Sequence, residues 1–310
     1  MTTQFQKVTF YNYFHNGDLH LSRQFVRRLM ETFPQYSYSY AHRCSHRILS
    51  DIAKLKIIPT SKIPRFNAAA GSKIACGTLY LNTWYGSYKS RFNGSCGIAF
   101  DALYDLFNHN FKTYFEISCA AIEADPTKFF PVIDFSKVHK TGVDNFISNS
   151  QYKKHILISN GASLSGQAAN FSFAPVLQAI VSRYPSYCFI VTNKDDKIKH
   201  ALSGVKNIKF SRDIIGELDN DLNENSYLSK FCDLVVGRSS GVYTFCMTQE
   251  NMFHSDKIMV SFSNIGSDDN KYWLGHKFRN VVKYRAKVFN YNIKNSDSCI
   301  KRLNEIIKEL

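Results

Sequence analysis

The sequence lacks the patterns that would assign it to several large classes of protein. No run of about 18 apolar residues occurs, so no membrane-spanning helix is expected. The eight cysteines form no C-x-x-C pair, which argues against structural zinc and favours reduced cysteines in the core. The N-terminus has no apolar signal-peptide core. We therefore expect a cytoplasmic protein.

Acidic residues are scarce relative to basic ones. The chain has 25 Asp and Glu against 39 Lys and Arg, a formal net charge of +14 at pH 7. This excess favours anionic partners: nucleotide-sugar phosphates, acidic glycolipids contacted at a membrane surface, or nucleic acid. Charge alone does not choose among them. One basic cluster that contributes to this charge is Arg23, Arg27 and Arg28.

The 310 residues, 44% of them hydrophobic, suit two domains of roughly 150 residues each. No internal repeat or low-complexity tract occurs. In the first half, residues 7–13 and 78–83 have the composition of buried strands. Residues 21–33 carry an apolar residue at every fourth position, which predicts a helix, and residues 98–107 predict another. A turn-like break at His15–Asp18 separates the first strand from its helix.

The second half repeats the alternation more clearly. Residues 155–159, 187–192 and 233–236 predict strands, while 173–184 and 298–310 predict helices. Strands that alternate with helices indicate an α/β fold with mainly parallel sheets. Two prolines fall within residues 125–150, the predicted interdomain connection. We therefore expect domains over residues 1–150 and 151–310, each Rossmann-like, with a cleft between them.

The loop after the first predicted strand contains a candidate catalytic carboxylate. Gly17 permits a sharp turn, and Asp18 then stands at the start of the helix. A carboxylate in this position can accept a proton from an attacking hydroxyl. The alternative is that Asp18 only caps the helix, which Asp does well. His15 and His20 are weaker candidates for contact with phosphate or acceptor.

Two loops of the second half are candidates for binding phosphate. Residues 159–167 form a Gly/Ser-rich loop before a helix, where N–H groups and hydroxyls suit an anion. Lys194, after the next strand, could reach the same anion. Residues 237–241 follow an apolar strand, so Ser239 or Ser240 could cap a helix whose N-terminus holds a diphosphate, with Arg238 neutralising the charge. The alternatives are ordinary capped turns with solvated Lys and Arg side chains.

Together these motifs resemble GT-B glycosyltransferases, most closely the heptosyltransferase-like family 9. The Gly-Asp motif at Gly17–Asp18, the strand and small-residue loop of residues 156–166, and the Asp-Leu-Val-Val-Gly-Arg-Ser-Ser-Gly segment of residues 233–241 carry the resemblance. The sequence departs from the family at Ser239, where the family has Asp, and at Thr244, where it has His. The donor contacts are therefore altered, and the donor sugar need not be heptose.

The resemblance implies an inverting, metal-independent transfer of a sugar from a nucleotide-sugar donor, with no cofactor. Asp18 would be the catalytic base, and the acceptor a hydroxyl of an anionic glycolipid or oligosaccharide. The residues expected to contact the donor are Gly17, Ser163, Ser165, Gly166, Gln167, Lys194, Arg238, Ser239, Ser240 and Gly241.

Three other interpretations remain open. The positive charge and the 15% aromatic content would also suit a phage-type enzyme that glycosylates modified DNA bases. A sugar-nucleotide 2-epimerase and a non-catalytic nucleotide-binding protein could share the same fold.

Overall fold

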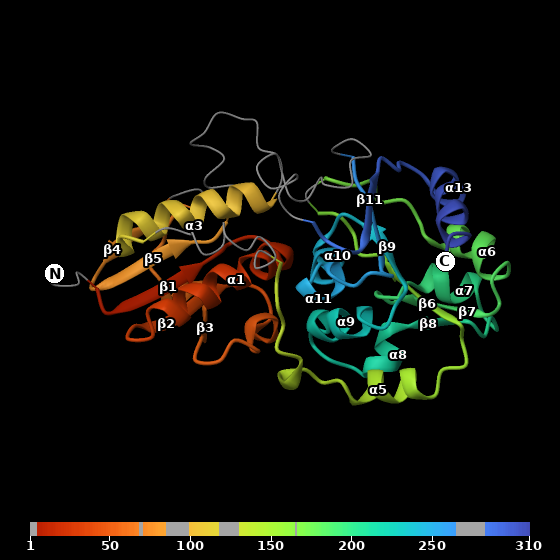
Figure 1. Ribbon diagram of the computed structural model, residues 1–310, viewed down its shortest axis with the longest axis horizontal. Helices are drawn as coiled ribbons and strands as arrows, with labels where there is room; N and C mark the ends of the chain where they lie inside the picture. Colours follow the sequence, from red (N-terminus) through yellow and green to blue (C-terminus); the bar gives the residue numbers. More distant parts are fainter. Residues whose placement is uncertain (1–4, 68–70, 85–98, 118–129, 165, 265–282) are drawn as a thin grey trace. The chain divides into compact units, whose positions relative to one another are not determined.

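Strands and helices alternate along most of the computed structural model, which describes residues 5–67, 71–84, 99–117, 130–164, 166–264 and 283–310 (Figure 1). The described chain divides into two units: unit 1 runs to Lys137 and includes Lys283 and Tyr284, and unit 2 contains the rest. The division falls earlier than residue 150. Helix α5 (Thr141–Ser148) packs on α8 (Ser211–Ile215) and belongs to unit 2.

Unit 1 is built on a sheet in the order β3-β2-β1-β5-β4. β1 pairs in parallel with both β2 and β5, β2 pairs in parallel with β3, and only the β4–β5 pair is antiparallel. The strands are β1 (Lys7–Tyr11), β2 (Ser37–His42), β3 (Lys56–Pro59), β4 (Lys73–Ala75) and β5 (Thr78–Asn82). The helices are α1 (Asn16–Thr32) and α3 (Ala99–Phe115).

The two faces of this sheet differ because successive strand residues point to opposite sides. On one face the ring of Phe10 packs on Tyr38 and Tyr40, and Tyr38 donates a hydrogen bond to the Leu29 carbonyl of α1. Helices α1 and α3 meet on this face. On the other face Tyr11 belongs to a separate aromatic cluster that includes Phe66. Ile63 and Phe66 of this cluster also line a pocket.

A buried ion pair connects α1 to the segment after β2. Arg23, fully buried, donates to the carboxylate of Asp51 and to the carbonyl of Ile48. Asp51 also accepts from Arg27 at 2.7 Å and from the Asp134 N–H at 3.1 Å. The predicted basic cluster of α1 is therefore partly committed to internal contacts, and these two arginines are not free to bind an external anion.

Unit 2 is built on a fully parallel sheet in the order β11-β10-β9-β6-β7-β8. The strands are β6 (Lys154–Ser159), β7 (Tyr187–Val191), β8 (Ile208–Phe210), β9 (Leu234–Arg238), β10 (Ile258–Phe262) and β11 (Lys287–Tyr291). The helices besides α5 and α8 are α6 (Ala174–Val181), α7 (Asp196–Ala201), α9 (Leu222–Ser229), α10 (Gly241–Phe245), α11 (Gln249–Met252) and α13 (Ser296–Ile307).

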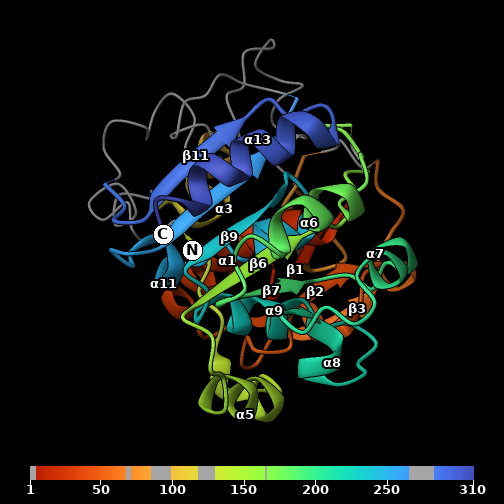
Figure 2. The same ribbon diagram turned by 90° about the vertical axis from the view of Figure 1, so that its right-hand side faces the viewer.

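Helices cover both faces of this second sheet. Helices α6 and α13 pack together and bury an apolar cluster against the strands, in which Leu177 and Leu303 are at most 1% exposed (Figure 2). Helices α9 and α10 pack on each other and lie on the opposite side. Burial on both faces explains why the central strands read as continuous apolar runs. Among the helices that the structure describes, none is long and apolar enough to cross a bilayer.

The central elements agree with the sequence prediction. The predicted strands match β1, β5, β6, β7 and β9, and the predicted helices match α1, α3, α6 and α13 within the described residues. One prediction is wrong: Asn16 to Asp18 do not form a turn but are the first turn of α1. Strands β2, β3, β4, β8, β10 and β11 were not predicted, and several of them are short edge strands.

Replacing Arg23 with Met should destabilise unit 1 strongly. The substitution keeps side-chain length but removes the main partner of a buried carboxylate, which costs about 3 kcal/mol and lowers the unfolding midpoint by on the order of 10 °C. Arg28→Gln on the same helix is the matched control. Thermal unfolding followed by circular dichroism measures both, and equal midpoints for the two variants would contradict the assigned role of the pair.

Candidate functional site

Asp18 lies at the carboxyl edge of the first sheet, one turn into α1. The chain leaves β1 towards β2 on one side, while β5 pairs with β1 on the other side. Such a reversal of strand order opens a crevice at the carboxyl ends of parallel strands, where ligands bind. The carboxylate of Asp18 accepts a hydrogen bond from the His15 N–H at 3.2 Å. Asp18 is therefore a helix-capping residue that also lies at the edge of the sheet where α/β folds commonly bind ligands.

Burial raises the pKa of Asp18 from its usual 3.8 to about 6, and the His15 N–H and the His15 charge oppose this only in part. A carboxylate with a pKa near neutrality is suited to proton transfer at physiological pH. Capping alone does not require such a pKa, because exposed caps stabilise the charged form. The environment of Asp18 thus favours the catalytic interpretation without excluding the capping one.

The two histidines near Asp18 have different surroundings. His15 is exposed at the N-cap of α1. His20 is fully buried, and its Nδ1 accepts a hydrogen bond from Arg23 Nε at 3.1 Å. Burial also lowers the pKa of His20 well below its usual range. His20 is therefore a neutral structural residue, and contact with phosphate or acceptor is not open to it.

In unit 2 the two predicted phosphate loops meet. They follow β6 and β9, which are neighbours in the sheet although the chain leaves β6 towards β7 on the other side. The reversal of strand order therefore lies between these two strands. Gln167 Nε2 donates to the Ser239 carbonyl at 2.8 Å and joins the loops directly. A Cβ on Gly237 would stand 2.2 Å from the Ser159 carbonyl oxygen, so only glycine permits this approach.

Arg238 holds the first of these loops in place. Its guanidinium donates to the carbonyls of Asn160, Gly161, Ala169 and Phe171, and its Cζ lies 5.1 and 4.7 Å from the ring centroids of Phe171 and Phe173. The side chain is only 5% exposed. These contacts occupy most of the donors that a bidentate phosphate contact would need. Direct binding of phosphate by Arg238 stays a prediction, beside an observed role in shaping the loop.

Three buried hydroxyls gather at this reversal of strand order. The Oγ atoms of Ser159, Ser163 and Ser240 are inaccessible and have no hydrogen-bond partner among the described residues. Ser159 ends β6, Ser163 follows it, and Ser240 is the N-cap of α10. Because buried polar groups are nearly always hydrogen-bonded, three such groups at one edge indicate a site for water or for a ligand oxygen.

The other predicted donor residues have distinct surroundings. Lys194 lies 3.6 Å from both Asp213 and Glu217 and is about half exposed, so it has internal carboxylate partners. Gly166 and Gln167 accept hydrogen bonds from Asn264, and Gly241 begins α10. Gly17 is buried inside α1, and Ser165 lies outside the described residues.

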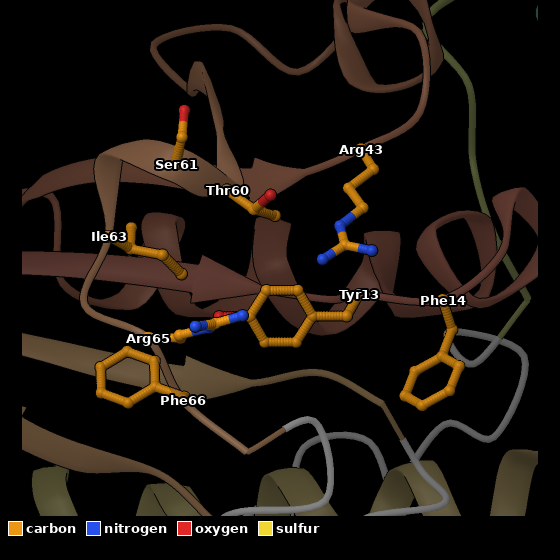
Figure 3. A pocket seen from close by; sticks show the side chains of 8 residues that line it. All are labelled: Tyr13, Phe14, Arg43, Thr60, Ser61, Ile63, Arg65 and Phe66. Carbon is orange, nitrogen blue, oxygen red and sulfur yellow. The ribbon is translucent and has the colours of Figure 1, made fainter.

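No three His, Cys, Asp or Glu side chains of the described ranges converge in a way that could hold a metal ion. Metal independence itself stays a prediction. Sequence reasoning missed one feature of unit 1, a pocket of about 680 Å³ with Arg43 and Arg65 in its wall (Figure 3). These residues come from separate loops and share no motif, so only the folded chain brings them together.

No family model and no curated protein matches the sequence. Solved structures do match over nearly the whole chain. A family 9 glycosyltransferase of Veillonella parvula is 11% identical with a TM-score of 0.53, covering 100% of this chain and 91% of the other. The ADP-heptose LPS heptosyltransferase II of E. coli is 14% identical with a TM-score of 0.52, covering 98% and 99%.

A third match is the E. coli heptosyltransferase WaaC with ADP, which is 10% identical with a TM-score of 0.53 and covers 97% of this chain and 98% of the other. Similarity at this level of identity establishes the fold. The chain has the GT-B fold of two Rossmann-like units, and the predicted resemblance to family 9 is confirmed at the level of that fold.

Asp18 should make the stability of the protein depend on pH. Because its folded pKa of about 6 exceeds the unfolded value of 3.8, its contribution is complete below pH 4 and is lost as the pH rises through 6. The loss amounts to about 3 kcal/mol. Asp18→Asn, which keeps the hydrogen-bond acceptor for His15, should remove this dependence.

The measurement is the unfolding midpoint of wild type and Asp18→Asn from pH 3.5 to pH 8. We expect the variant to gain on the wild type as the pH rises, with most of the gain between pH 4 and pH 6 and little further change above pH 7. A difference between the two proteins that stays constant across this range would show that the carboxyl has an ordinary pKa.

Proposed function

We propose that this chain is a nucleotide-sugar-dependent glycosyltransferase, in which unit 2 binds the donor and Asp18 is the catalytic base. The observation that carries the proposal is the group of buried, unpartnered hydroxyls of Ser159, Ser163 and Ser240 at the strand reversal of a GT-B fold. Hydroxyls can donate to the oxygens of a diphosphate, which would supply partners that these groups lack.

The charge around these hydroxyls supports an anionic ligand. Arg238 is buried beside them, and its described neighbours are carbonyls and aromatic rings, with no carboxylate within ion-pair distance. A buried cation with no carboxylate in direct contact attracts an anion in a medium of low dielectric constant. The donor phosphate would supply this counter-charge even without a direct hydrogen bond to the guanidinium.

The reaction that follows is a single displacement. The acceptor hydroxyl oxygen forms a bond to the anomeric carbon of the sugar, and the bond from that carbon to the nucleoside diphosphate breaks. Asp18 takes the hydroxyl proton as attack proceeds, and the leaving diphosphate retains the bond electrons. Attack opposite to the leaving group inverts the anomeric configuration.

Stabilisation of the leaving group in this proposal comes from the serine hydroxyls and the Arg238 charge. No metal and no cofactor is needed for the step. We propose an anionic glycolipid or oligosaccharide as the acceptor and the cytoplasm as the place of reaction. The alternative functions are transfer of the sugar to DNA and epimerisation of the nucleotide-sugar without transfer.

Asp18→Asn should lower turnover by on the order of a hundredfold or more while donor binding is retained, because the amide cannot accept the proton. In the wild type, kcat/KM should fall as the pH drops below about 6, where Asp18 becomes protonated. Glu31→Gln, at the exposed far end of α1, is the control. Release of nucleoside diphosphate from a donor and acceptor panel measures the rate, and a fully active Asp18→Asn would remove Asp18 from the mechanism.

Ser163→Ala and Ser240→Ala should each raise the Kd for a nucleoside diphosphate by on the order of tenfold, since each loses one hydrogen bond to a charged oxygen. Titration calorimetry with ADP, UDP and GDP, repeated in EDTA, measures this. Ser182→Ala, on the exposed end of α6, should bind like the wild type. Unchanged affinity in both site variants, with the ligand still bound, would relocate the donor site.

A further inference from the structure

A pocket of about 600 Å³ lies beside β8, the strand that ends the unit 2 sheet on one side. Its lining includes Ile208, Lys209 and Phe210, which are the whole of β8. Successive side chains of a strand point to opposite faces of its sheet. A pocket lined by three consecutive strand residues therefore follows the free edge of the strand and does not lie over one face.

Helices from both faces of the sheet border this pocket. On one face α7 contributes Ile198 and packs on α6. On the other face α5 contributes Phe146, and Asp144 of α5 accepts a hydrogen bond from the Tyr227 hydroxyl of α9 at 2.6 Å. Because α6 and α9 cover opposite faces of the sheet, the pocket is a groove along the edge of β8 between α7 and α5. We call it the β8 groove.

The free edge of β8 presents backbone groups to this groove. The Asn207 carbonyl accepts a hydrogen bond from the Phe189 N–H of β7 at 2.9 Å. Carbonyl directions alternate along a strand, so the N–H and C=O of Ile208 point away from β7. No described residue forms a hydrogen bond with them on that side. An edge of this kind can pair with an added strand, as several peptide-binding domains do.

The side chains beside the edge differ between its two faces. Ile208 and Phe210 pack against the apolar cluster that contains Ile198 and Leu202. Lys209 lies between them in sequence, so its side chain points to the opposite face, where α5 lies. An added strand would therefore meet an apolar surface on one face and a cation on the other.

Positive charge exceeds negative charge along the β8 groove. Lys199 and Lys209 are exposed lining residues, and neither forms an ion pair with a carboxylate of the described ranges. Asp213 also lines the groove, but its carboxylate lies 3.6 Å from Lys194 in an ion pair. The charge that is left unpaired is positive, which favours an acidic ligand.

Two other occupants fit these observations less well. An acyl chain would leave the N–H and C=O of Ile208 without hydrogen-bond partners, which costs free energy. A second copy of this chain would pair β8 with its own counterpart about a two-fold axis. Such pairing brings the two Lys209 side chains together, and like charges on opposing strands are destabilising.

We infer that the β8 groove binds an extended acidic segment of a partner protein, which adds to the sheet as a further strand. Its residues alternate between apolar and acidic: the apolar side chains contact the face of Ile208 and Phe210, and the carboxylates contact the face of Lys209. In the sheet order, β6 and β7 separate β8 from the strand reversal beside β9. This binding is therefore independent of the proposed sugar transfer.

Labelled peptides added to the intact protein test the inference. The probe is acetyl-Val-Glu-Val-Glu-Val-Glu-amide, and fluorescence anisotropy gives its Kd. We expect it to bind at least about tenfold more tightly than the matching Val-Lys peptide. Lys209→Glu should weaken the acidic peptide by on the order of tenfold and strengthen the basic one, because it turns an attraction into a repulsion. Methylation of the amide nitrogens should abolish binding, since the peptide then cannot donate to the strand edge.

Lys197→Glu makes the same charge change at an exposed α7 residue outside the groove lining and should bind like the wild type. Unfolding midpoints check that both variants are folded. Absence of acidic-peptide binding would overturn the inference and leave Lys209 as a residue that protects the edge from pairing. Equal affinity for the two peptides would also overturn it. So would Lys209-dependent binding to phosphatidylglycerol vesicles without peptide binding, or a dimer that Lys209→Glu disrupts.

Discussion

The guanidinium of Arg238 is the contact on which the candidate donor site depends. Arg238 is the last residue of β9, and its guanidinium donates hydrogen bonds to four carbonyl groups of the loop after β6. This loop lies about seventy residues earlier in the chain. A buried arginine needs this many acceptors because its five N–H donors cannot be left without partners. The loop that carries Ser163 is therefore shaped by this buried cation. In the proposed function the same charge favours an anion at this edge of the sheet.

A similar double role applies to Asp18. Its carboxylate accepts the His15 N–H and so stabilises the start of α1, yet burial holds its pKa near 6. An isolated capping carboxylate would be more stable in water, where its charged form is solvated. Keeping it in a partly buried position costs folding free energy, which is typical of residues that function requires. Capping and the proposed catalytic role are thus compatible for this residue.

The strands predicted from the sequence lie inside the two sheets, whereas all four edge strands, β3, β4, β8 and β11, were missed together with the interior strands β2 and β10. Strands β6 and β9 are apolar on both faces, whereas β8 at the sheet edge is three residues long and only partly buried. The loops that carry Ser163 and Ser240 were located because they follow such strands. The partners of Lys194 and Arg238 were not predictable, because they are set by tertiary contacts between segments distant in sequence. The pocket of Arg43 and Arg65 is hidden for the same reason, since its residues follow three different strands.

The departures from the family pattern have a structural consequence for the donor sugar. At the position where the family carries histidine, Thr244 is 4% exposed and its Oγ1 donates to the Ser240 carbonyl at 2.8 Å. The Thr244 hydroxyl is therefore engaged in a hydrogen bond within α10. Its side chain is shorter than that of histidine and carries no charge. Where the family has Asp, this chain has Ser239. Its backbone N–H donates to the Phe262 carbonyl, and its carbonyl accepts a hydrogen bond from Gln167 Nε2. Two side chains that the family has at these positions are thus replaced by residues at most 4% exposed, while the hydroxyl of Ser240 has no partner among the described residues. If unit 2 binds a diphosphate at this edge as proposed, a site altered in this way can still select a different sugar, because the phosphate and the sugar are recognised by different atoms.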